Sequence, residues 1–118
     1  MVDPRFHPAT KGSDTPEVSV IIPCKGHPDV LLHLLRDLTE QQTDRAFEVI
    51  VVDAWSDDAI RTAAQSQGVV VVRSGSGHLP GAARNLGADA ARGPILAFID
   101  ADCRPDPGWV QAAADALE

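Results

Sequence analysis

Two aspartates separated by one alanine are the residues of this sequence best suited to chemistry. Asp100 and Asp102 directly follow the apolar run ILAFI at residues 95–99, so two carboxylates leave a buried strand close together. Hard oxygen ligands suit Mg²⁺ or Mn²⁺, ions that usually keep waters and share phosphate oxygens of a substrate. The pair therefore indicates a divalent metal site. The alternative is a pair of solvated or helix-capping aspartates, because Asp is common before helices.

A third aspartate and an arginine occupy comparable places. Asp53 follows the largely apolar run at residues 47–52, where it could grip a base or ribose or, alternatively, cap the next helix. Arg84 lies in the first turn of an expected helix, where a cation opposes the helix dipole. A phosphate contact would account for Arg84, and an exposed arginine on a flexible stem is the alternative.

The segments that carry these residues indicate a parallel sheet covered by helices. Short β-branched runs alternate with longer segments of helical period, which is typical of α/β architecture. Strands are expected at residues 18–22, 47–52, 69–72 and 95–99, each followed by a helix. Right-handed crossovers that reverse direction after the third strand predict the strand order 3-2-1-4. The predicted fold class is a Rossmann-like, three-layer α/β fold.

Ligands of such sheets bind at the carboxyl ends of the strands, where loops and helix N-termini converge. The first strand is expected to stop at Pro23 and to continue into Cys24-Lys25-Gly26 at that edge. The glycine-rich stretch 74–81 lacks the third glycine of GxGxxG and the GK[ST] of a phosphate-binding loop, so it is interpreted as a flexible edge of the site. A single site at the carboxyl edge is the resulting hypothesis.

Composition restricts the partners. The formal charge of −7 argues against nucleic-acid and anionic-membrane binding, because both need a basic surface. No apolar run approaches the roughly 20 residues of a membrane helix. Two cysteines, Cys24 and Cys103, are too few for a disulfide scaffold, so we expect free thiols and a cytoplasmic location.

The 118 residues fit one domain. Residues 1–17 are rich in proline and polar residues without period and are expected to form a flexible leader, which leaves residues 18–118 as the domain. The last expected helix, from Trp109 to the end, has an apolar face and no C-terminal cap. This pattern predicts truncation at the C-terminus.

Four motifs in this order, VSVIIP, FEVIVVD, PGAARNLGADAARG and ILAFIDAD, resemble family 2 glycosyltransferases of the GT-A fold. The resemblance covers about residues 18–118. It implies the N-terminal, nucleotide-binding half of an enzyme that transfers a sugar from a nucleotide-diphosphate donor to an acceptor, with Mn²⁺ or Mg²⁺ as cofactor. By this resemblance, Asp102 binds the metal that bridges the donor diphosphate, and Asp100 supports the ribose or the metal shell.

The resemblance also assigns the other candidates. Asp53 and the backbone after Pro23 would line the nucleoside pocket, and Arg84 would contact the base or the phosphates. Lys25 stands where family members often carry an aromatic residue, and is either a phosphate partner or a surface charge. The catalytic base and the acceptor residues of the family lie beyond the end of this sequence, so the catalytic residue, the acceptor, the donor base and the sugar stay unassigned.

Three other interpretations remain open at this stage. A dinucleotide-binding Rossmann module shares the alternating pattern but needs GxGxxG after the first strand. A phospho-receiver domain could use Asp53 as phosphoacceptor but needs an acidic pair after the first strand. The third is a truncated or degenerate gene product without function.

Overall fold

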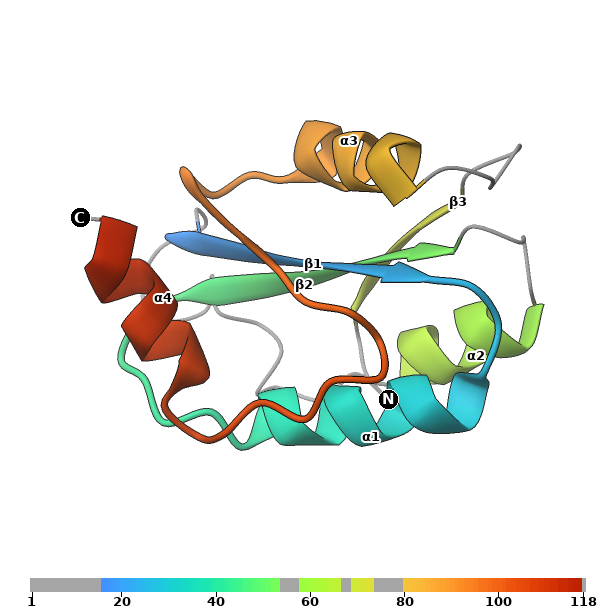
Figure 1. Cartoon of the computed structure of the whole chain (residues 1–118), viewed down its shortest axis with the longest axis horizontal. Helices are drawn as coiled ribbons and strands as arrows, with labels where there is room; N and C mark the ends of the chain where they lie inside the picture. Colours follow the sequence, from blue (N-terminus) through green and yellow to red (C-terminus); the bar gives the residue numbers. More distant parts are fainter. Residues whose placement is uncertain (1–15, 54–57, 67–68, 74–79, 118) are drawn as a thin grey trace.

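The computed structural model of the protein describes residues 16–53, 58–66, 69–73 and 80–117. Parallel strands in this part of the chain form one sheet with the order β3-β2-β1-β4 (Figure 1). The strands are β1 (Val18–Cys24), β2 (Phe47–Asp53), β3 (Val70–Arg73) and β4 (Ile95–Phe98). The predicted α/β class and the predicted strand order are confirmed.

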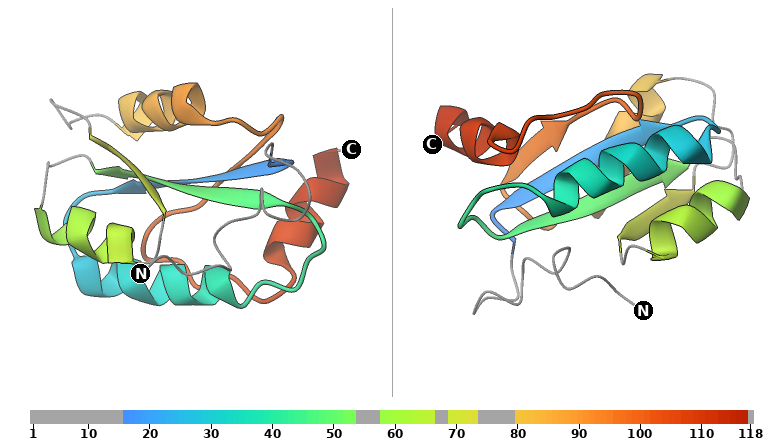
Figure 2. Two further views of the ribbon diagram at one scale, coloured as in Figure 1. Left: turned by 180° about the vertical axis from the view of Figure 1, so that it is seen from behind. Right: turned by 90° about the horizontal axis from the view of Figure 1, so that it is seen from below.

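Helices cover both faces of this sheet. They are α1 (Pro28–Thr39), α2 (Asp58–Ser66), α3 (Pro80–Ala90) and α4 (Trp109–Leu117). Helix α3 lies on one face, whereas α1 and α2 lie on the other, as the views in Figures 1 and 2 agree. Because each parallel crossover adds a helix to one face or the other, the two central strands β1 and β2 become buried on both sides.

The core has two parts, one on each face of the sheet. Alternate side chains of β1 and β2 pack against the buried leucines of α1, namely Leu31, Leu34, Leu35 and Leu38. The side chains between them, Ile21, Ile50 and Val52, pack against Ala83 of α3. Val30, which the helical period places on the same face as the leucines, is instead 38% exposed. It lies in the first turn of α1 and borders a pocket described below.

Strand β1 continues past the proline that was expected to stop it. Pro23 pairs with Val52, and Cys24 pairs with Asp53. The carbonyl of Ile21 accepts a hydrogen bond from the Ile99 N–H on the β4 side. The backbone N–H and C=O groups of residues two apart in a strand point toward the same neighbouring strand. The backbone nitrogen of Pro23 therefore points to the β4 side, at a position beyond the end of β4. Its missing N–H therefore removes no ladder hydrogen bond, which is why the strand tolerates it.

Helix α3 packs closely on the sheet because it has a glycine at the contact. A Cβ atom added at Gly87 would overlap Ile21 Cγ2 of β1 and lie 3.1 Å from Val52 Cγ2 of β2. A Cβ at Gly81, near the start of the same helix, would meet no heavy atom within 4 Å. Of these two glycines, Gly87 is therefore the one that allows helix α3 to lie close to the sheet.

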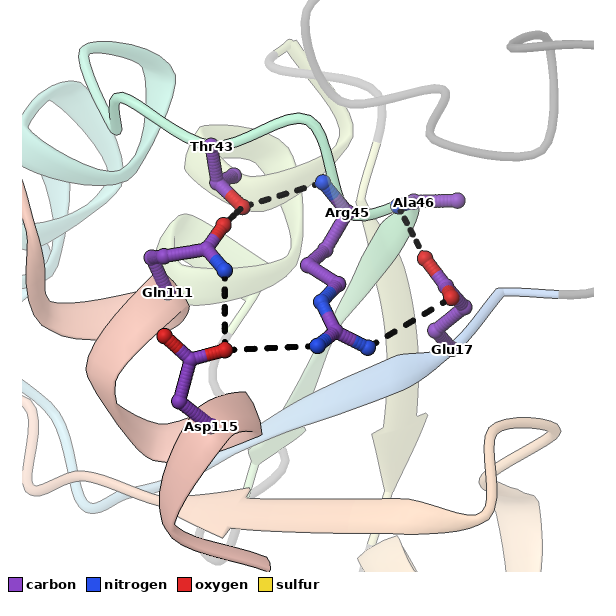
Figure 3. A network of polar contacts seen from close by, with 6 residues as sticks. All are labelled: Glu17, Thr43, Arg45, Ala46, Gln111 and Asp115. Atoms are coloured by element: carbon purple, nitrogen blue, oxygen red, sulfur yellow. Dashed lines mark hydrogen bonds and ion pairs between the residues drawn. The ribbon is translucent and has the colours of Figure 1, made fainter. Parts of the chain in front are cut away.

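A polar network joins α4 to the starts of β1 and β2 (Figure 3). The Arg45 guanidinium lies 3.6 Å from a Glu17 carboxylate oxygen and 3.3 Å from Asp115 Oδ1 of α4. Thr43 donates a hydrogen bond to Gln111 of α4 at 2.5 Å. Glu17 falls in the expected leader 1–17, yet its backbone N–H donates to Ala46 and its carbonyl accepts from Ile95. The ordered fold therefore includes Glu17, and residues 1–15 lie outside the described part of the chain.

A buried carboxylate fixes the turn between α3 and β4. Glu48 of β2 is 4% exposed and accepts hydrogen bonds from Ser19 Oγ at 2.6 Å, the Arg92 N–H at 2.7 Å and Arg92 Nε at 3.2 Å. Ser19 Oγ in turn accepts from the Gly93 N–H at 2.9 Å. One carboxylate therefore satisfies donors from β1 and from the residues that lead into β4.

Replacing Glu48 by alanine is expected to lower the free energy of unfolding by about 2–3 kcal/mol, because the Ser19 hydroxyl and the Arg92 N–H lose their acceptor inside the protein. Urea denaturation of both proteins measures the difference. Glu40→Ala is the matched control, since Glu40 is exposed at the end of α1 and the expected change is close to zero. Equal stability of the two variants would contradict the anchoring role of Glu48.

Candidate functional site

An open pocket of about 590 Å³ lies at the carboxyl edge of the sheet. At this edge β1 leads into α1, and β4 leads into the turn that carries Asp100 and Asp102, which we call the acidic turn. We call it the central pocket. It is lined by Pro23, Cys24, Lys25, Gly26, His27, Val30, Ala83, Asp100, Ala101 and Asp102. The pocket therefore occupies the edge of the sheet at which a single site was expected.

The wall of the central pocket on the β1 side is a tight reversal between strand and helix. Gly26 has φ 71° and His27 has φ 60°, so two successive residues adopt left-handed backbone conformations before α1 begins. Cys24 Sγ donates a hydrogen bond to the Gly26 carbonyl at 3.3 Å. Pro28 then occupies the first turn of α1, where its lack of an N–H removes no helical hydrogen bond.

Asp100 and Asp102, which we call the acid pair, also line this pocket. The Cys103 N–H donates to the Asp100 carbonyl at 3.0 Å, which closes the turn after β4. Possible metal ligands from Asp100, Asp102 and Cys103 all lie within 4.8 Å of one another, and all three side chains are exposed. Two carboxylates at this spacing fit a Mg²⁺ or Mn²⁺ ion that completes its shell with water and phosphate oxygens. The softer sulfur of Cys103 was not among the predicted ligands.

The segment after the acid pair is fastened to the C-terminal end of α1. The Arg104 guanidinium donates two hydrogen bonds to the Asp37 carboxylate, at 2.5 and 3.2 Å. The Gln41 side chain donates to the Asp106 carbonyl at 2.7 Å and accepts from the Val110 N–H at 2.8 Å. These contacts fix the far end of the acidic turn. Sequence reasoning missed them, because no local pattern links residues so far apart in the chain.

The contact between Arg104 and Asp37 should make part of the stability depend on pH. The hydrogen bond from Arg104 holds the pKa of Asp37 below its ordinary value. The stabilisation should therefore be fully present above the unfolded-state pKa, about 3.9, and be lost as the pH falls through the lowered pKa of the folded state. Asp37→Asn should lower the thermal midpoint slightly at neutral pH and not at all at the acid limit.

Thermal unfolding of wild type and Asp37→Asn at several pH values measures this difference. The effect should be small and should shrink in high salt, because the Arg104 partner of the ion pair is solvent-exposed. A constant difference between the two proteins from neutral pH to the acid limit would show that the Asp37 charge is not its source.

A second pocket of about 560 Å³ adjoins the central pocket and shares Asp100 with it. Its other lining residues are Arg84, Phe98, Ile99, Cys103, Arg104, Pro105 and Trp109. The predicted site residues are therefore distributed unevenly. Pro23, Lys25, Asp100 and Asp102 share the central pocket, whereas Arg84 lies in the second one.

Asp53 lines neither of these pockets. It is fully buried at the end of β2, where it pairs with Cys24. The chain that follows it, residues 54–57, and the glycine-rich stretch 74–79 lie outside the described residues, so their expected contributions stay predictions. Residues that the sequence did not single out for the pocket include His27 and Val30.

The two cysteines lie in different environments. Cys24 is buried, Cys103 is exposed, and neither forms a disulfide, as predicted. In the described part of the chain, none of the helices combines the length and apolar character required to cross a bilayer.

A parallel sheet with the order 3-2-1-4, with two aspartates and a pocket at its carboxyl edge, is a Rossmann-like arrangement of the kind found in GT-A glycosyltransferases. The family model described as "Glycosyl transferase family 2" matches residues 19–118. The chain therefore belongs to glycosyl transferase family 2.

Similar proteins agree with this assignment. Glycosyltransferase AglE of Haloferax volcanii is 32% identical over 113 residues, which are 89% of this chain and 36% of AglE. The mannosyltransferase PcManGT from Pyrobaculum calidifontis, solved in complex with GDP-Man and Mn²⁺, superposes with a TM-score of 0.71 at 28% identity, over 87% of this chain and 32% of that one.

A third likeness is to mannosyl-3-phosphoglycerate synthase from Rubrobacter xylanophilus. It has a TM-score of 0.69 at 26% identity, over 99% of this chain and 43% of that one. The chain thus spans about a third of the length of AglE and less than half of these two solved structures.

Proposed function

We propose that this chain binds a nucleotide-diphosphate sugar together with a divalent cation, Mn²⁺ or Mg²⁺, for glycosyl transfer to an acceptor. The observation that carries the proposal is the central pocket, in which Asp100 and Asp102 share one cavity with Lys25 at the carboxyl edge of the sheet. Family membership supports sugar transfer as the reaction, and the GDP-Man and Mn²⁺ bound to PcManGT support this class of ligand.

Charge explains why the acid pair and the donor need a cation. Two carboxylates and a diphosphate repel each other, and the chain carries a formal charge of −7. In our proposal Asp102 and Asp100 hold the cation, and Lys25 adds a positive charge to the lining of the same pocket. A bound cation would supply the charge that stabilises the nucleoside diphosphate as it leaves the sugar.

The remaining predicted residues are proposed to act on the nucleotide. Pro23 and Asp53 come from the ends of the two central strands, where the nucleoside would enter the edge of the sheet. Arg84 lies in the neighbouring pocket that shares Asp100, so we propose that it contacts the phosphates from that side. We assign no catalytic base and no acceptor to these residues.

Calorimetric titration with GDP, UDP and NAD, each with Mn²⁺ or with a chelator, tests the proposal. We expect one of the two nucleoside diphosphates to bind in the presence of Mn²⁺ and to bind much more weakly with the chelator. NAD should not bind, since the chain has no GxGxxG after β1. Metal-independent binding of NAD, or no binding of either diphosphate, would overturn the proposal.

A further inference from the structure

The residue before α1 has a backbone conformation that disfavours its side chain. His27 has φ 60° and ψ 61°. It is the only residue other than glycine with a positive φ in the described part of the chain. Left-handed conformations bring Cβ close to the following carbonyl oxygen, and glycine adopts them without that penalty. A histidine at this position therefore needs a compensating role for its ring.

The fold offers no such role among the described residues. His27 occupies the N-cap position of α1, but its side chain makes no capping hydrogen bond. The imidazole is exposed and borders the central pocket together with Asp100 and Asp102. Strained residues that the fold itself does not use are concentrated at ligand sites. The exposed His27 side chain is therefore available to contact a ligand of the central pocket.

The other residues that line the central pocket indicate which part of a ligand the His27 ring would contact. Among the described residues that line this pocket, the other side chains are aliphatic, acidic, a thiol or the Lys25 ammonium, so His27 supplies the only flat ring within this part of the lining. Proteins that bind bases commonly stack them on flat side chains, because every base has a π-face. The acid pair would hold the cation and diphosphate, which leaves the base to the wall formed by the β1–α1 reversal.

We propose that His27 determines donor binding by stacking its imidazole on the base of the nucleotide. The inference rests on the proposed function, since it presupposes that the central pocket holds a nucleoside diphosphate. It differs from that function in assigning affinity for the base, as distinct from the phosphates, to a single residue.

Three variants separate the ring from the backbone. His27→Asn keeps a residue that tolerates the left-handed region but removes the ring, His27→Gly also relieves the strain, and His27→Phe keeps a flat ring without imidazole nitrogens. The measurements are the dissociation constants for GDP and UDP and for inorganic pyrophosphate, all with saturating Mn²⁺, and the thermal midpoint of each protein.

We expect His27→Asn and His27→Gly to weaken binding of the nucleoside diphosphate by about 5- to 100-fold, the range for losing one stacked base. Pyrophosphate binding should change less than twofold in both. His27→Phe should bind the nucleotide within a few-fold of wild type. His27→Gly should unfold at the same temperature as wild type or higher.

The outcomes distinguish the two levels of the proposal. If wild type binds neither nucleoside diphosphate, the proposed function fails and this inference fails with it. If wild type binds but His27→Asn and His27→Gly bind equally well, only the role of His27 is overturned. Equal weakening of nucleotide and pyrophosphate, or a lower thermal midpoint in His27→Gly, would likewise reject stacking in favour of a phosphate or structural role.

Discussion

Replacing Asp102 by asparagine is expected to weaken Mn²⁺-dependent binding of a nucleoside diphosphate by about 1–3 kcal/mol, or roughly 5- to 100-fold. Asparagine keeps the shape of the side chain but removes one of the two charges that would hold the cation beside Asp100. Calorimetric titration with and without Mn²⁺ measures the change. The residual binding in a chelator should be the same in both proteins.

Asp106→Asn is the matched control for this experiment. Asp106 lies a few residues further along the same segment, is exposed, and lines neither of the two pockets. Its Oδ1 accepts a hydrogen bond from the Gly108 N–H, which asparagine can also accept. The control therefore changes net charge equally without touching the acid pair. Unchanged metal-dependent affinity in Asp102→Asn would remove Asp102 from the site.

Adding one methyl group to α3 should have opposite effects at its two glycines. Gly87→Ala is expected to lower the free energy of unfolding by about 1–3 kcal/mol, because the new Cβ would overlap Ile21 Cγ2 and force helix and sheet apart. Gly81→Ala should be neutral or stabilising by up to about 1 kcal/mol, since alanine favours helix and meets no atom there. Chemical denaturation of the two variants measures both values.

The same helix carries side chains of both pockets, so the comparison has a second readout. Ala83 lines the central pocket, and Arg84 lines the neighbouring one. Moving α3 outward in Gly87→Ala should weaken Mn²⁺-dependent nucleotide binding, whereas Gly81→Ala should leave it unchanged. Two variants of equal stability and equal affinity would show that the sheet adapts to the added methyl group without displacing the helix.

The architecture could be predicted from the sequence because its signals are local. The two buried strands are rich in β-branched residues, and α1 repeats its apolar residues at helical spacing. The crossover rule then leaves few strand orders. The errors in the expected element bounds also have local causes. Pro23 was expected to end the first strand, but it lies past the last residue of β1 that pairs with β4, so its missing N–H breaks no pairing. Val30 fits the helical period, but it borders the central pocket and is 38% exposed, whereas Leu31 beside it is buried in the core.

The candidate site could be predicted only in part. Asp100 and Asp102 were identifiable because both follow an apolar strand, and that placement fixes the edge of the sheet where they lie. The strand was expected to be buried, but β4 is an edge strand in which only Ala97 is buried. His27 gave no signal, since a left-handed histidine cannot be recognised from residue types. The attachment of Arg104 to Asp37 depends on the return path of the chain along α1, which no short motif encodes.

The central position of β1 has a consequence for how the chain acquires its structure. Among the described strands, β1 comes first in the sequence, and it pairs on one side with β2 and on the other with β4, which comes last. Val18 therefore cannot pair with Ile95 until the residues between them have been synthesised. Contacts this distant slow folding, because loop closure precedes the pairing that stabilises it. A nascent chain would therefore expose one unpaired edge of β1, and pulsed hydrogen exchange should find β4 protected after β2.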